Sequence, residues 1–80
     1  GMTSAIIEPR GIFLPALLKA AAAIIIVHNH PSGSLEPSKE DKNICTQMEE
    51  AGRILSIPVR DFVIVTENGF TSFAERGLMK

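Results

Sequence analysis

The sequence predicts an α/β fold in which a single mixed β-sheet is flanked by two main helices. A β-branched run at residues 23–27, an alternating stretch at residues 59–66 and a segment of helical period between them indicate this class. With 80 residues and 45% hydrophobic content, the chain can build one core. We therefore expect one domain over residues 2–80, and we interpret Gly1 as a remnant of tag removal.

The first third of the chain predicts a short edge strand followed by a helix. Ser4–Glu8 is the candidate strand, and proline and glycine residues then mark the entry to the helix. Because proline in a helix interior removes a hydrogen bond, Pro15 should lie in the first turn. The helix is therefore expected to begin near Phe13 or Leu14 and to run to about Ala22.

The central segment predicts a buried strand, a loop and an amphipathic helix. Ala23–Val27 does not alternate, which is typical of a central strand buried on both faces, and we expect it to end at His28. Residues 29–37 are rich in Pro, Ser, Gly and Asn and predict a loop. Ser38 has the character of a helix N-cap. The apolar positions of the helix that follows share one face: Ile44, Cys45, Met48, Ala51 and Leu55.

The last third predicts a β-hairpin. Val59–Thr66 alternates as a strand does, Glu67-Asn68-Gly69 is a hairpin turn signal, and Phe70–Phe73 returns as the partner strand. A last helical turn is expected to end near Leu78.

Composition excludes several classes of function. The net charge is −1 with only eight Lys and Arg, so the chain lacks the basic surface that duplex binding requires, and nucleic acid is not an expected partner. The apolar stretch Ile12–Val27 contains Pro15 and Lys19 and is shorter than the ~20 residues of a membrane span. Cys45 is the only cysteine and is expected to be a buried hydrophobe, which fits a reducing, cytoplasmic location.

Four polar residues can meet at one end of the predicted sheet. Residues i and i+2 of a strand point to the same side, so His28 and His30 can present both imidazoles to one point. Residues i and i+3 in the first turn of a helix are neighbours, so Ser38 and Asp41 share a face. The short 31–37 loop can fold that face over the histidines.

The chemistry of these residues allows two interpretations. Two imidazoles and a carboxylate leave one position of a tetrahedral zinc ion open, as in catalytic zinc sites, where the metal lowers the pKa of water to about 7. Ser38 could then bond the water or a developing oxyanion. The alternative is that these residues have structural roles only. The histidines would then lie at the end of a strand without binding a metal, Ser38 would serve as the helix N-cap, and Asp41 would interact favourably with the helix dipole.

The arrangement resembles a known family pattern. His28-x-His30-Pro31 followed by Ser38-x-x-Asp41 resembles the JAMM metalloprotease pattern H-x-H-P-x6-S-x-x-D in residue type and spacing. The run of residues 28–33 is more narrowly similar to the signature of the RadC family within that superfamily. Further likenesses lie at Pro9-Arg10, residues 20–23, Glu50-Ala51-Gly52 and residues 72–78.

The resemblance implies a JAB/MPN-like (cytidine-deaminase-like) fold and a Zn2+ site. By that resemblance His28, His30 and Asp41 are the zinc ligands, and Ser38 assists the water or the oxyanion. JAMM enzymes cleave peptide or isopeptide bonds with a glutamate on an earlier strand as general base. RadC-like domains run longer at the N-terminus, so we expect those elements to be missing here. Glu8, the only acidic residue before His28, is the remaining candidate base.

Three functions follow from the resemblance. The first is a zinc-dependent hydrolase acting on a protein or peptide substrate, impaired if the glutamate base is missing. The alternatives are a non-catalytic JAMM-like module in a protein complex and a DNA-repair-associated protein, as the family name suggests. Missing N-terminal elements would leave a sheet edge and helix faces uncovered, including Leu14 and Leu18, so a homodimer is also expected.

Overall fold

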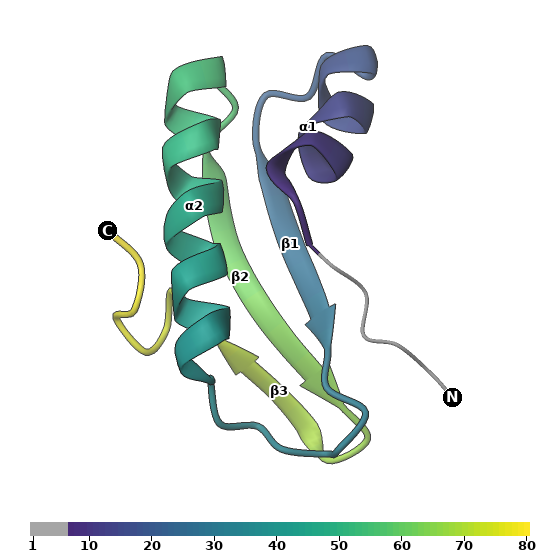
Figure 1. Cartoon of the computed structure of the whole chain (residues 1–80), viewed down its shortest axis with the longest axis vertical. Coiled ribbons are helices and arrows are strands. Elements are labelled where there is room, and N and C mark those ends of the chain that lie inside the picture. The colour runs from purple at the N-terminus through teal and green to yellow at the C-terminus, as the bar shows by residue number, and fades with distance from the viewer. Residues whose placement is uncertain (1–6) are drawn as a thin grey trace.

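The computed structural model describes residues 7–80 and confirms an α/β fold on one mixed sheet (Figure 1). The sheet has the order β1-β2-β3, in which β1 and β2 are parallel and β2 and β3 are antiparallel. α2 packs on β2, and α1 packs against α2. The elements in chain order are α1 (Pro9–Leu18), β1 (Ile24–Asn29), α2 (Lys39–Leu55), β2 (Val59–Thr66) and β3 (Gly69–Ser72).

The start of α2 is fixed by a capping box, as the N-cap assignment of Ser38 predicted. Ser38 Oγ accepts a hydrogen bond from the backbone N–H of Asp41 at 3.0 Å, and Asp41 Oδ2 accepts one from the N–H of Ser38 at 2.8 Å. Two backbone donors that the first turn leaves without helical partners are thereby satisfied. Of the predicted stripe, Cys45 and Met48 are buried and Ile44 and Ala51 are half-buried, whereas Leu55, the last residue of the helix, is exposed.

The predicted bounds of α1 are wrong at both ends. The helix begins at Pro9, because a proline in the first turn gives up an N–H that needs no helical partner, and it accommodates Pro15 in its interior. It ends at Leu18 rather than at Ala22, since Ala20 adopts a left-handed φ of 53° and donates its N–H to the carbonyl of Leu17.

β1 is not buried on both faces, contrary to the prediction. Ile26 lies in the core, but Ile25 and Val27 on the opposite face are 61% and 60% exposed. The helices cover only one face, and within the described residues β1 lies at the edge of the sheet. The strand also extends beyond His28 to Asn29.

The hairpin agrees closely with the sequence. β2 has the predicted bounds, and β3 begins and ends one residue earlier than expected. Phe62 and Phe73 are fully buried with ring centroids 4.9 Å apart, and they join the hairpin to the core. The expected last helical turn is a hydrogen-bonded turn in which Leu78 N–H donates to Phe73 O.

Two further predictions concern the first strand and Cys45. Most of the predicted Ser4–Glu8 strand lies outside the described residues, and Glu8 itself is the N-cap of α1. Cys45 is buried as expected, and burial, followed by the charges of Glu49 and Asp61, raises the pKa of its thiol to about 12.

Two further findings concern the expected homodimer and the apolar stretch of the sequence. Leu14 and Leu18 are exposed on α1, and the expected homodimer stays a prediction. Among residues 7–80, no helix has the length and apolar content needed to cross a membrane.

Two glycines within helices should respond to alanine with opposite signs. A Cβ on Gly52 would lie 2.5 Å from the carbonyl oxygen of Ile57, whereas one on Gly11 would meet nothing within 4 Å. We expect Gly52→Ala to lower the free energy of unfolding by about 1–3 kcal/mol. Gly11→Ala should raise it by about 0.5–1 kcal/mol. Urea unfolding followed by circular dichroism measures both, and equal stability of Gly52→Ala and the wild type would contradict the packing described.

Candidate metal centre

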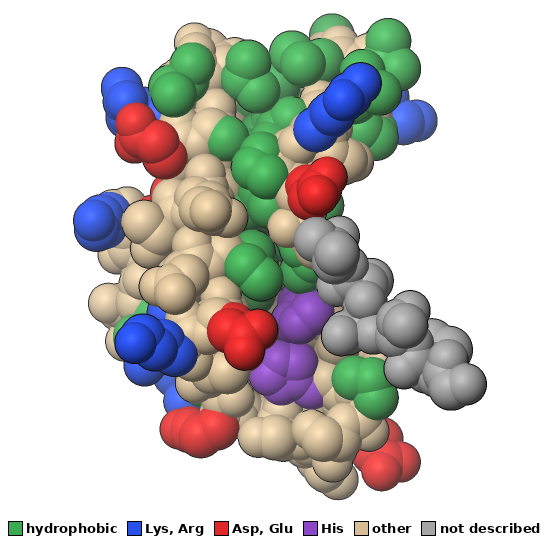
Figure 2. All heavy atoms as spheres, viewed as in Figure 1, with side chains coloured by type: hydrophobic (Ala, Val, Ile, Leu, Met, Phe, Trp, Pro, Cys, Tyr) green, Lys and Arg blue, Asp and Glu red, His purple; other side chains and the backbone are tan. Residues whose placement is uncertain are grey.

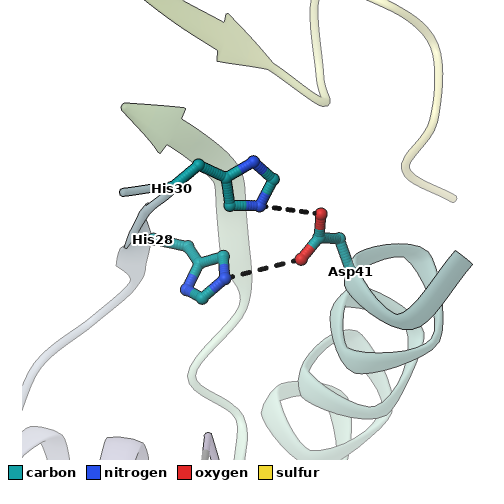
Figure 3. A group of neighbouring side chains, drawn as sticks. All are labelled: His28, His30 and Asp41. Carbon is teal, nitrogen blue, oxygen red and sulfur yellow. Dashed lines mark ion pairs between the residues drawn. The ribbon is translucent and has the colours of Figure 1, made fainter. Parts of the chain in front are cut away.

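Two elements bring the candidate ligands together at the end of β1 and the start of α2. His28 lies in β1, and the backbone N–H of His30 donates to Val65 O at 3.1 Å, which continues the pairing with β2 beyond the strand. Both imidazoles therefore point to the same side of the sheet, toward Asp41 in the first turn of α2 (Figure 3).

The three side chains form a tight cluster. His28 Nε2 lies 3.5 Å from Asp41 Oδ1, and His30 Nε2 lies 3.0 Å from Asp41 Oδ2. One ligand atom from each residue falls within 4.8 Å of the others. The side chains of His28, His30 and Asp41 are 25%, 15% and 5% exposed. Figure 2 shows both imidazoles side by side at the surface, whereas the Asp41 side chain is almost fully buried.

A hydrogen bond fixes the tautomer of His30. Its Nδ1 lies 2.9 Å from the carbonyl oxygen of Ser34, and since a carbonyl only accepts, Nδ1 carries the proton. In its neutral form the ring then presents a lone pair at Nε2 to the carboxylate of Asp41. Two acceptors 3.0 Å apart repel each other unless a proton or a cation lies with them. A ring whose Nδ1 donates to a backbone carbonyl and whose Nε2 faces the site has the orientation that is common in metal-binding histidines.

The environment of Asp41 favours its anionic form. Burial raises the pKa of this carboxyl, but hydrogen bonds from the backbone and side chain of Ser38 lower it, as do the nearby imidazoles of His30 and His28. The net result is a pKa below the ordinary value of 3.8. At neutral pH the cluster therefore contains a buried negative charge, which requires a positive partner.

The three groups lie close enough together to bind one metal ion. Ligand atoms about 2.0–2.1 Å from a tetrahedral metal ion lie about 3.3 Å from one another. His28 Nε2 and His30 Nε2 lie 3.5 and 3.0 Å from different oxygens of Asp41, and one ligand atom from each of the three residues lies within 4.8 Å of the others. Nitrogen and oxygen donors of this kind suit zinc and several other divalent metals. The cluster is thus a possible metal centre.

The other predicted site residues have different positions. Ser38 is exposed and adjoins the cluster through its two hydrogen bonds with Asp41. Glu8 is exposed at the N-cap of α1, where its side chain makes no capping bond, and it is not a member of the metal cluster. The catalytic roles assigned to Ser38 and Glu8 stay predictions.

Sequence reasoning missed the residues around the loop that follows His30. Gly33 has a positive φ of 86°, and Ser34 Oγ accepts a hydrogen bond from the backbone N–H of Glu36. The role of the Ser34 carbonyl toward His30 was not foreseen, because every residue has a carbonyl and no sequence signal marks one. The contacts of Asn68 and Thr71 with the same loop span more than 30 residues and were also missed.

Fold and site together define a small α/β domain with a His-His-carboxylate cluster at the end of a parallel strand. The family model described as RadC-like JAB domain matches residues 1–78. The chain belongs to this family, and its α/β fold with a mixed sheet is consistent with a JAB-like fold.

Curated relatives support the assignment. The UPF0758 protein of Salinibacter ruber is 51% identical over 79 residues, which cover 99% of this chain and 34% of the relative. UPF0758 proteins of Symbiobacterium thermophilum and Trichlorobacter lovleyi are 44% and 45% identical over 78 residues, covering 98% of this chain and 33% and 34% of theirs. The chain thus spans about one third of the length of these relatives.

Acid should reveal the charge of Asp41. Because the pKa of this carboxyl is lower in the folded protein than its ordinary 3.8, its contribution to stability is fully present above about pH 5 and is lost as the pH falls through the folded value. We expect the free energy of unfolding of the metal-free protein to fall more steeply with acid in the wild type than in Asp41→Asn. Urea titrations at a series of pH values test this, and parallel pH profiles would count against it.

Proposed function

We propose that this domain binds Zn2+ through His28, His30 and Asp41 and hydrolyses a peptide or isopeptide bond. The observation that carries the proposal is the convergence of three acceptor groups on one point, with His30 Nε2 directed there by the Nδ1 bond to the Ser34 carbonyl. Membership of the RadC-like JAB family supports the metal assignment.

The ligand set suits catalysis better than a purely structural role. Three protein ligands leave one position of a tetrahedral ion open to a water molecule or a substrate. When bound, zinc supplies a positive charge that polarises a carbonyl and acidifies water. The partial exposure of His28 and His30 gives a substrate access to this point.

Ser38 is placed to stabilise the charge that develops on the substrate oxygen. Its Oγ accepts the N–H of Asp41, and its one hydroxyl proton, which also interacts with the Asp41 carboxylate, can turn toward a substrate oxygen. The capping box holds Ser38 next to the ligand Asp41. We propose that Ser38 donates this proton in a hydrogen bond to the developing oxyanion or to the attacking water.

Amide hydrolysis also needs a group that takes the proton of water and delivers it to the leaving nitrogen. In the JAMM pattern, the general base is a glutamate that precedes the two histidines. Glu8 is the only acidic residue before the histidines in this chain, so we propose it for that role. Its exposed carboxylate is free of any capping bond at the start of α1.

Zinc binding provides the first test. The purified protein should bind one equivalent of Zn2+. Loss of a residue that only supports a metal ligand typically weakens metal binding by about 10- to 100-fold, and His30→Ala, which removes a ligand, should weaken it by more. Asp41→Asn should do the same, because it removes the anionic ligand. Glu40→Gln, which neutralises the neighbouring exposed carboxylate, is the matched control and should bind as the wild type does. Competition titration with a chromogenic chelator measures the affinity, and a wild type that binds no zinc would exclude the proposal.

Turnover provides the second test. With a set of peptide and isopeptide substrates, Ser38→Ala should lower kcat per bound zinc by about 100-fold or more, as loss of one oxyanion donor does. Zinc content is measured in the same samples, because the Ser38 hydroxyl also belongs to the capping box that holds Asp41. Glu8→Gln should abolish turnover and leave zinc affinity unchanged. Equal rates for Glu8→Gln and the wild type would assign the proton transfer to another group. Stoichiometric zinc without turnover on any substrate would favour a non-catalytic module that holds protein partners.

A further inference from the structure

Three consecutive backbone carbonyls of the loop after His30 each accept a hydrogen bond from a side chain. The middle carbonyl, of Ser34, accepts from the candidate ligand His30, and the two on either side accept from the β2–β3 hairpin. The pairs are Asn68 Nδ2 with Gly33 O at 3.1 Å, His30 Nδ1 with Ser34 O at 2.9 Å, and Thr71 Oγ1 with Leu35 O at 2.5 Å.

The two hairpin donors are themselves held in place. Asn68 lies in the turn between β2 and β3, and its backbone N–H donates to Thr66 Oγ1 at 2.9 Å. Thr71 lies in β3 and is 3% exposed. The side chain of Asn68 also packs closely on the loop, since a Cβ on Gly33 would lie 3.0 Å from its Nδ2. The loop thus rests on the β2–β3 hairpin.

We propose that Asn68 and Thr71 are positioning residues of the metal centre. By fixing the peptide units on either side of Ser34, they hold its carbonyl where it can accept the Nδ1 proton of His30. That bond sets the tautomer of the ring and aims Nε2 at Asp41. The proposal rests on the proposed zinc site, and it assigns to the hairpin a role in metal affinity.

The composition of the loop explains why such support is needed. Residues 31–37 contain two prolines, two serines and a glycine at a positive φ, so they form no regular structure that would position the Ser34 carbonyl. Without an outer anchor, the His30 ring could rotate or exchange tautomers. Part of the binding free energy of zinc would then be spent on ordering the ligand.

The test measures zinc affinity and the His30 ring together. Asn68→Asp keeps the size of the side chain but replaces the donor with an acceptor, and Thr71→Val keeps the shape and removes the hydroxyl. Each should weaken Zn2+ binding by about 10-fold, the lower end of the range for outer-shell changes. Thr71→Ser, which retains the hydroxyl, should restore the affinity. In the zinc-loaded protein, the His30 Nδ1 proton should give a protected NMR signal that both weakening variants lose.

Thr46→Val is the matched control, because Thr46 Oγ1 also donates to a backbone carbonyl, that of Lys42, on the exposed side of α2. It should leave both readouts unchanged. Thermal unfolding of each variant identifies loss of fold, and if Thr71→Val unfolds, Asn68→Asp in the exposed turn decides the question. Wild-type affinity and an intact Nδ1 signal in Asn68→Asp would overturn the positioning role and leave the zinc site standing. A wild type that binds no zinc would overturn both.

Discussion

The carboxylate of Asp41 is the group on which the rest of this domain depends. Its Oδ2 closes the capping box by accepting the N–H of Ser38 and also faces His30 Nε2, while Oδ1 faces His28. The helix start and the candidate centre therefore share one side chain. Whatever fixes the first turn of α2 also fixes the third ligand, and no separate loop has to deliver it.

This sharing has an electrostatic consequence. Hydrogen bonds that stabilise the helix start also stabilise the anion, so a negative charge stays at a position that is only 5% exposed. Such a charge is costly unless a cation accompanies it. Protonated imidazole or a metal ion can meet the requirement. The electrostatic attraction for a cation thus arises from a helix-capping carboxylate that lies beside two histidines at the end of a strand.

Local patterns predicted most of the fold and the three side chains that meet in the cluster. The N-cap at Ser38, the burial of Cys45 and Met48 in α2, and the bounds of β2 depend on neighbours in sequence, and they were confirmed. Spacing made His28, His30 and Asp41 plausible partners, and the resemblance to RadC-like domains favoured a metal among them. The errors concern global context: a short apolar run does not reveal how many of its faces are covered, so Ile25 and Val27 were wrongly taken as buried. The hydrogen bonds from Asn68 to Gly33 and from Thr71 to Leu35 join residues 35 and 36 positions apart in the sequence, and no local pattern predicts such contacts.

The parallel pairing of β1 with β2 has a consequence for how the domain folds. This pairing can form only after the chain has passed through α2, whereas the β2–β3 hairpin joins adjacent segments. The histidines and Asp41 lie on opposite sides of the 31–37 loop, at the beginning of that crossover. Their meeting therefore marks the moment when helix and strand dock. A metal ion added during refolding would report when the start of α2 docks on the end of β1, and because all three ligands lie within residues 28–41, it could be captured before β1 pairs with β2.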